Sequence, residues 1–229
     1  MLLCDIGRTH GTKVNQMRTK TLLLTAALSA VAITGAFAQS TNVYSANIVG
    51  YVNYVNPPGY RMIANPLNST NNDVSNIFAN PPAGLTIFKR NAGGTGYDSA
   101  TFDPDIPGWS GPLTISPGEG AFLFNPDGGN YTNTFVGEVV LNSTNGVPAG
   151  YSIRSSVVPQ SGGIQTVLGY PVGNGDTIFR FNGSGYNSST FDPDVPGWTD
   201  GEPTPNVGES FWIFNNGATK NWVRNFSVN

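Results

Sequence analysis

The chain has 229 residues, of which only 11% are charged, and its formal net charge at pH 7 is −3. A weakly acidic chain with few Lys and Arg residues lacks the basic surface that a phosphate backbone attracts, so we expect no binding to nucleic acid. Aromatic residues make up 11% of the chain, which indicates a packed core rather than intrinsic disorder.

The first 38 residues predict an export signal. A basic stretch starts at Met17, an apolar run covers residues 21–35, and Ala36-Phe37-Ala38 is a small-x-small cleavage sequence. The apolar run is shorter than the ~20 residues that a membrane span needs. We therefore expect cleavage after Ala38, with residues 1–16 as an upstream extension and no transmembrane anchor in the mature chain. The mature protein is then extracellular, on the cell surface or in the periplasm.

Cleavage at that bond removes the only cysteine and the only histidine, Cys4 and His10. The mature chain would contain neither a disulfide nor an imidazole. This argues against nucleophilic catalysis by Cys or by a Ser-His pair, and against ordinary zinc sites. Seven basic and thirteen acidic residues remain after Ala38, which gives a net charge of −6.

An internal repeat organises the rest of the chain. Residues 102–109 read FDPDIPGW and residues 191–198 read FDPDVPGW, 89 positions later. Aromatic residues match on both sides of this octapeptide, in the pairs Tyr60 and Tyr151, Phe88 and Phe179, Tyr97 and Tyr186, and Phe122 and Trp212. We therefore predict two tandem modules, covering residues 39–138 and 139–229.

Short β-branched and aromatic runs between Gly, Pro and Asn residues predict strands. They cover residues 43–55, 60–64, 85–89, 121–124, 177–181 and 211–214. The runs at 121–124 and 211–214 are unbroken and apolar, so we expect strands buried on both faces, with Trp212 in the core. Apolar residues spaced i, i+3 and i+4 predict one short helix in each copy, at residues 74–78 and 164–168. The predicted fold class is all-β: two tandem homologous small β-sandwich or partly open barrel modules, each with one short helix.

Similar strand sequences occur three times at the module boundaries, at residues 47–52, 133–139 and 221–228. An unpaired apolar edge strand promotes aggregation or strand addition. We therefore expect the last of these strands to pair within its own chain. The alternative is that it completes the sheet of a neighbouring molecule, which would form a fibre.

The sequences GYRMIANPL at residues 59–67 and LTISPGEGAFLF at residues 113–124 resemble a pattern of exported bacterial tandem-repeat β modules. That pattern runs Gly-aromatic-x-Leu/Ile-x-x-Pro and later Leu-x-Pro-Gly-x-Gly-aromatic. The second copy departs from it, with Ser155-Ser156 in place of the turn before Pro66 and with Pro205-Asn206-Val207-Gly208 in place of Ser-Pro-Gly. The resemblance implies an exported location and a role in adhesion or in the structure of the cell envelope.

The repeated Asp-Pro-Asp sequences are the first candidate site. Two carboxylates one residue apart can bind one Ca²⁺ ion together with backbone carbonyls, which makes Asp103, Asp105, Asp192 and Asp194 candidate metal ligands. The alternative, which we favour, is structural: an Asp residue before Pro fixes an Asx turn, and Trp covers the edge of the core. Calcium is the only cofactor for which the sequence gives a candidate site.

Glu119 and Glu209 each follow a Gly residue and precede a predicted strand. They could be catalytic carboxylates of a glycoside hydrolase, or they could cap a turn. A catalytic pair needs two carboxylates in different environments, and two similar copies would rarely each keep that difference. We therefore predict that the protein is not an enzyme.

Trp109, Trp198 and Trp222 are candidate ligand-binding residues, because aromatic rings stack on sugars. The alternative is a place in the core, since large aromatic residues dominate small β cores. Trp222 stands between Lys220 and Arg224, so we expect it to be the most exposed of the three.

The first hypothesis from the sequence is that the chain is a non-catalytic, structural or adhesive β-repeat protein that is secreted or lies on the cell surface. A carbohydrate-binding module, with or without calcium, is the second, and a glycoside hydrolase is the third. The expected partners are components of the cell envelope or the extracellular matrix, with polysaccharide and a second copy of the chain as candidates.

Overall fold

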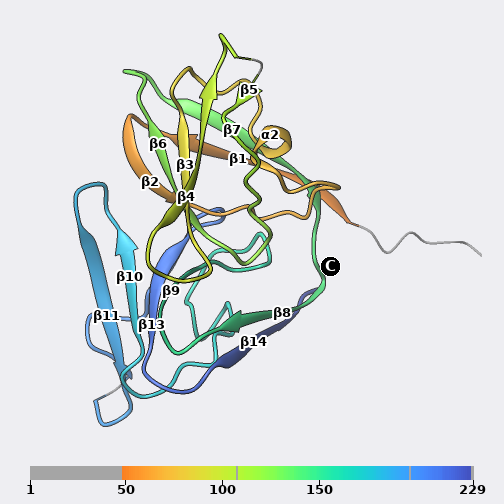
Figure 1. Ribbon diagram of the computed structural model, residues 1–229. Helices are drawn as coiled ribbons and strands as arrows, with labels where there is room; N and C mark the ends of the chain where they lie inside the picture. The colour runs from red at the N-terminus through yellow and green to blue at the C-terminus, as the bar shows by residue number, and fades with distance from the viewer. Residues whose placement is uncertain (1–47, 107, 196, 228–229) are drawn as a thin grey trace, which may run out of the picture. The chain divides into compact units, whose positions relative to one another are not determined.

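The computed structural model describes residues 48–106, 108–195 and 197–227 (Figure 1). The predicted export signal and the upstream extension lie outside these residues. Within the described ranges the protein is nearly all β, arranged as two sandwich-like modules of antiparallel strands. None of the helical structure found there is long and apolar enough to cross a membrane.

Module 1, residues 49–138, contains a five-stranded sheet and a two-stranded ribbon. The sheet has the order β2-β6-β3-β4-β5 and the ribbon pairs β1 with β7. Their bounds are β1 Val49–Asn56, β2 Gly59–Ile63, β3 Thr86–Arg90, β4 Tyr97–Asp103, β5 Gly108–Trp109, β6 Ala121–Asn125 and β7 Tyr131–Glu138.

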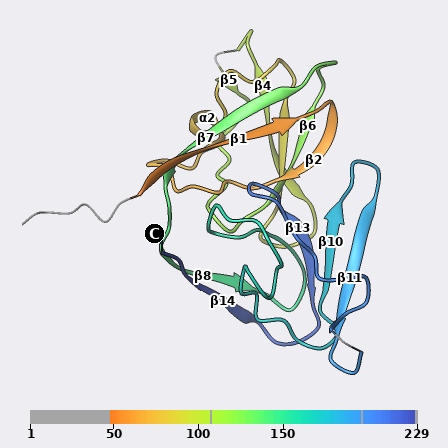
Figure 2. The same ribbon diagram turned by 180° about the vertical axis from the view of Figure 1, so that it is seen from behind.

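Module 2, residues 142–225, repeats this topology strand by strand. Its sheet has the order β9-β13-β10-β11-β12, and its ribbon pairs β8 with β14. Their bounds are β8 Asn142–Val147, β9 Gly150–Arg154, β10 Thr177–Phe181, β11 Tyr186–Asp192, β12 Gly197–Trp198, β13 Phe211–Asn215 and β14 Lys220–Asn225. Views from opposite sides both show β1 beside β7 and β8 beside β14 (Figure 2).

The core of each module lies between its sheet and its ribbon. In module 1, buried Ile87 of β3 and Leu123 of β6 belong to the same cluster as Phe135 of β7. In module 2, buried Ile178 of β10 and Ile213 of β13 pack in one cluster with Trp222 of β14. Each five-stranded sheet is thus covered by its ribbon on one face only.

The expectation that β6 and β13 are buried on both faces was wrong. Alternate residues of each strand are buried, and Phe122, Phe124, Trp212 and Phe214 between them are partly exposed. Successive side chains of a strand point to opposite faces of the sheet, so these aromatic residues lie on the face that the ribbon does not cover. Trp212 is therefore outside the core.

The predicted helix of module 1 is α2, Val74–Ile77, and it lies against β5 and β7. Asp73 caps it, because its side chain accepts a hydrogen bond from the amide of Ser75. In module 2 the corresponding segment forms a hydrogen-bonded turn over residues 164–168 instead of a helix. There the side-chain oxygen of Glu202 accepts the amide hydrogen bonds of Gln165 and Thr166, at 2.6 and 2.8 Å.

The last strand pairs within its own chain, as expected. β14 forms a ladder with β8 from Lys220 with Val147 to Asn225 with Asn142. The sequence prediction missed β8, whose residues NSTNGV are polar and lack a β-branched apolar run. This strand is specified by its partner rather than by its own composition.

The two modules contact each other through a reciprocal set of backbone interactions. Ile63 at the end of β2 bridges to Glu209 of module 2, and Arg154, its counterpart at the end of β9, bridges to Glu119 of module 1. Hydrogen bonds from Ala64 N to Gly208 O, 2.8 Å, and from Ser155 N to Gly118 O, 3.1 Å, repeat the same relation. The two modules thus contact each other through equivalent residues, as the two subunits of a twofold dimer do.

The space between the modules is tight where the equivalent residues Gly120 and Ser210 meet. A Cβ atom added to Gly120 would lie 2.4 Å from Ser210 Cβ and 2.5 Å from a methyl group of Ile153. Ser210 is fully buried. Residue 120 therefore has no room for a side chain while the modules stay together.

Candidate aromatic binding site

The Asp-Pro-Asp loops form the Asx turns that the structural interpretation predicted. Asp103 Oδ1 accepts a hydrogen bond from the amide of Asp105, and Asp192 Oδ1 accepts one from Asp194, each at 2.9 Å. The described part of the chain contains no cluster of three or more His, Cys, Asp or Glu residues that could hold a metal ion. The calcium site stays a prediction.

An Asn side chain can replace Asp103 in this turn, because its amide oxygen is also an acceptor. We expect Asp103→Asn to change the free energy of unfolding by less than about 0.5 kcal/mol, and Asp103→Ala to lower it by about 1 kcal/mol. Urea unfolding in calcium and in EGTA measures both. A stabilisation by calcium that both substitutions abolish would contradict the purely structural role.

Glu119 and Glu209 each cap a turn and pair with a cation. Glu119 Oε2 accepts hydrogen bonds from the amide of Ser116 and from Lys89 Nζ, both at 2.8 Å. Glu209 accepts two from Arg180, at 2.6 and 2.7 Å, and one from the amide of Asn206, at 3.0 Å. The hydrogen bond to Glu209 raises the pKa of Arg180. Both carboxylates thus accept a turn amide and pair with a cation of the neighbouring strand, which matches a structural role in each copy.

The predicted tryptophans lie in different environments, and the expectation that Trp222 is exposed was wrong. Trp222 is 1% exposed, and its indole Nε1 donates to Leu168 O at 2.8 Å. Lys220 and Arg224 lie on the same inward face of β14 as Trp222. Their charges are satisfied there, because Lys220 pairs with Asp176 and Arg224 donates to Gln160 Oε1 at 2.6 Å. Trp109 and Trp198 are partly buried and pack edge-on against Phe102 and Phe191, 5.8 and 5.6 Å between ring centroids.

A different set of aromatic residues gathers on the uncovered face of each sheet. In module 1 the rings form a shallow cavity of about 270 Å³, which we call cup 1, lined by Tyr60, Phe88, Tyr97 and Phe122. In module 2 the equivalent rings, together with Arg90, line a cavity of about 320 Å³, which we call cup 2: Tyr151, Phe179, Tyr186 and Trp212. Every ring of cup 1 has its counterpart in cup 2.

The tyrosines are the most accessible part of each cup. Tyr60 and Tyr97 are 49% and 46% exposed, and Tyr151 and Tyr186 are 53% and 44% exposed. The remaining rings are partly exposed and lie between the tyrosines on neighbouring strands. Exposed aromatic side chains gathered on one face are typical of surfaces that bind a partner.

Each cup is bordered by a residue from the other module. Phe181, the last residue of β10, stands edge-on to Phe122 of cup 1, with ring centroids 6.0 Å apart. Arg90, the equivalent last residue of β3, lies over Trp212 of cup 2, with its Cζ atom 5.1 Å from the ring centroid. Phe181 also packs against Tyr186 of cup 2, with ring centroids 5.4 Å apart. The aromatic surface therefore continues from one module to the other.

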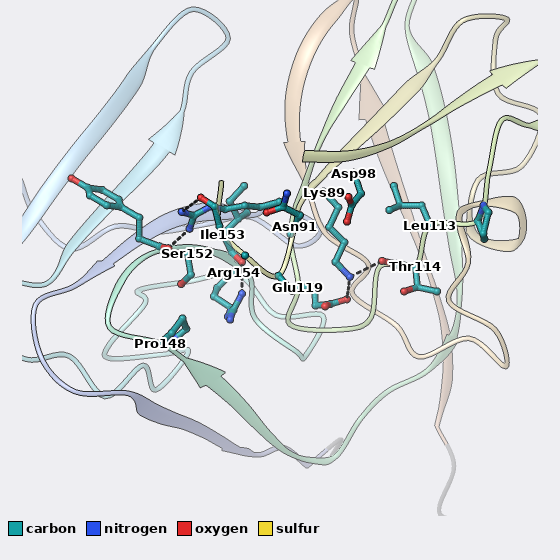
Figure 3. Close-up of a pocket in the computed structure, with 17 residues that line it drawn as sticks. Lys89, Asn91, Asp98, Leu113, Thr114, Glu119, Pro148, Ser152, Ile153 and Arg154 are labelled. Atoms are coloured by element: carbon teal, nitrogen blue, oxygen red, sulfur yellow. Dashed lines mark hydrogen bonds and ion pairs between the residues drawn. The ribbon is translucent and has the colours of Figure 1, made fainter. Parts of the chain in front are cut away.

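A polar groove of about 710 Å³ adjoins cup 2 between the modules and shares Arg90 and Tyr151 with it. Its charged lining residues are Lys89, Arg90, Asp98, Glu119 and Arg154 (Figure 3). Figure 3 shows Lys89 directed at Glu119 and at the carbonyl of Thr114, to which it donates at 2.8 Å.

All eight cup residues are matched pairs of the internal repeat, but the repeat alone does not show that they share one open site. The available signal was that aromatic residues occupy equivalent positions of the same strands in both copies. That signal identifies a shared face, but it does not say whether the face is buried or open. Searches against protein-family models, curated proteins and solved structures found no match to this chain.

Proposed function

We propose that this protein is a non-catalytic, exported adhesive protein that binds polysaccharide through cups 1 and 2. The observation that supports this most directly is the open, duplicated aromatic face. Hexose rings present a flat face of C–H groups, and burying that face against an aromatic ring removes apolar surface from water. Tyrosine hydroxyls at the rim can bond the hydroxyl groups of the sugar.

The chemistry of the cups fits a glycan better than a globular protein partner. Cup 1 is lined by aromatic residues alone, and its two tyrosines are about half exposed. Recognition sites for small ligands combine such apolar walls with a few polar groups. The two equivalent sites on one continuous surface also favour a repeating ligand, because binding at one site raises the effective concentration at the other.

Binding should depend on both cups. With mature protein on a panel of soluble and insoluble polysaccharides, we expect Phe122→Ala or Trp212→Ala alone to weaken binding about tenfold, and the double variant at least about a hundredfold. Affinity electrophoresis and isothermal calorimetry measure the loss.

Tyr51→Ala is the matched control, because Tyr51 is 75% exposed and lies outside the cups; it should bind like the wild type. The absence of binding to every polysaccharide tested, combined with self-association by sedimentation, would instead favour a structural protein that binds copies of itself.

A further inference from the structure

The two cups differ in one chemical respect. At the place where cup 1 receives the phenyl ring of Phe181, cup 2 receives the guanidinium of Arg90. The lining of cup 1 carries no charge, whereas cup 2 has a cation stacked on its largest ring. The duplication therefore produced one neutral site and one cationic site.

The guanidinium of Arg90 is hydrogen-bonded to backbone carbonyls, and it forms no ion pair with a described acidic residue. Its guanidinium donates to the carbonyl oxygens of Gly94, at 2.9 Å, and of Tyr151. Between described residues, the ion pairs join Lys89 to Glu119, Arg180 to Glu209 and Lys220 to Asp176, and Arg90 takes no part in them. These two carbonyls fix the guanidinium in place at the mouth of the cup.

A second arginine adds positive charge on the same side. Arg154 lines the adjoining groove and donates to the carbonyl oxygens of Gly146 and Ile153, both at 2.9 Å. Burial lowers the pKa of Arg154; Glu119 opposes that change, and the nearby charge of Arg90 adds to it. Two neighbouring guanidinium groups repel each other, so an anion placed between the cup and the groove would relieve that repulsion.

We propose that cup 2 binds an acidic sugar, a hexuronate unit of a polysaccharide, whose ring packs against the exposed rings of Tyr151 and Tyr186 while its carboxylate pairs with Arg90. This inference rests on the proposed function and specifies its ligand. Arginine pairs with a carboxylate through two parallel hydrogen bonds, and the guanidinium of Arg90 lies over Trp212 at the mouth of the cup.

Polygalacturonate and its fully methyl-esterified form are the probes, because they share one sugar chain and differ only in whether the carboxyl group is ionised or carries a methyl ester. We expect the wild type to bind the acid form about tenfold more tightly at low salt. Raising the salt concentration should reduce this preference. In Arg90→Gln the preference should disappear, so that the variant binds the acid form and the methyl ester equally.

Two further variants control for folding and for general charge. Arg90→Lys keeps the cation without its two-pronged geometry and should retain part of the preference. Arg61→Gln removes a cation outside both cups and outside the groove, and it should retain all of the preference. Thermal melting of each variant shows that it is folded.

A preference for the acid form that survives in Arg90→Gln would overturn the inference, and so would equal binding to both forms by the wild type. Equal, Arg90-dependent binding to dextran sulfate would also overturn it, because the site would then accept any anion. If no polysaccharide binds, neutral or acidic, the proposed function itself fails.

Discussion

Replacing Asp176 with Ala should lower the free energy of unfolding of module 2 by about 3–5 kcal/mol, because it leaves a partly buried lysine without its partner. Asp176 is fully buried and forms an ion pair with Lys220. Its carboxylate also accepts hydrogen bonds from Tyr170 Oη, 3.0 Å, and from the amides of Gly173, 2.9 Å, and Asn216, 3.1 Å. Urea unfolding followed by tryptophan fluorescence measures the loss.

Module 1 provides the matched control for this substitution. By the strand alignment, Leu85 stands at the place of Asp176 and Tyr131 at the place of Lys220. Replacing a buried ion pair by well-packed apolar residues is often neutral or stabilising. The double variant Asp176→Leu with Lys220→Tyr should therefore recover only part of the stability that either single substitution loses, because the Tyr170 hydroxyl and the amides of Gly173 and Asn216 still lose their acceptor. A double variant no more stable than the single ones would show that the pair itself is required.

Deleting residues 221–229 should leave module 2 unfolded. The deletion removes most of β14 and with it Trp222. Trp222 is fully buried and packs against Tyr170, with ring centroids 5.5 Å apart. The loss of one large buried aromatic side chain alone costs about 3–5 kcal/mol, and the deletion also exposes the ladder edge of β8. Circular dichroism and size-exclusion chromatography of the truncated chain should show loss of structure or aggregation.

Two point substitutions on the same strand separate packing from pairing. Trp222→Ala should cost about 3–5 kcal/mol. Val223→Ala should change stability by less than about 0.5 kcal/mol, because Val223 is 52% exposed on the other face of β14. A truncated protein that remains a folded monomer would contradict the assignment of β14 to the core of module 2.

The repeat allowed the architecture to be read from sequence. The octapeptide at residues 102–109 and 191–198 and the matched strands around it predicted two similar all-β modules, and the strand order is the same in both. Local turn chemistry was predictable too: Asp103 and Asp192 form their Asx turns within two residues of themselves. Such bonds depend only on neighbouring residues, so the sequence alone is sufficient to predict them.

Which face of each strand meets water could not be predicted in the same way. Trp212 and Trp222 stand ten residues apart on consecutive strands of module 2, yet one lies on the open face of the sheet and the other is 1% exposed in the core. Alternation assigns residues to two faces, but only the position of the ribbon decides which face is covered.

The sequence by itself determined the duplicated all-β fold, the turns and the aromatic composition of the strands, because each of these follows from local spacing and residue type. The tertiary structure alone decided that the aromatic residues form two open cups and that each cup is completed from the other module. Phe181 and Phe122 are 59 residues apart, and Arg90 and Trp212 are more than twice as far apart. Contacts over such separations depend on how the sheets, ribbons and modules pack, which no local pattern of residues specifies.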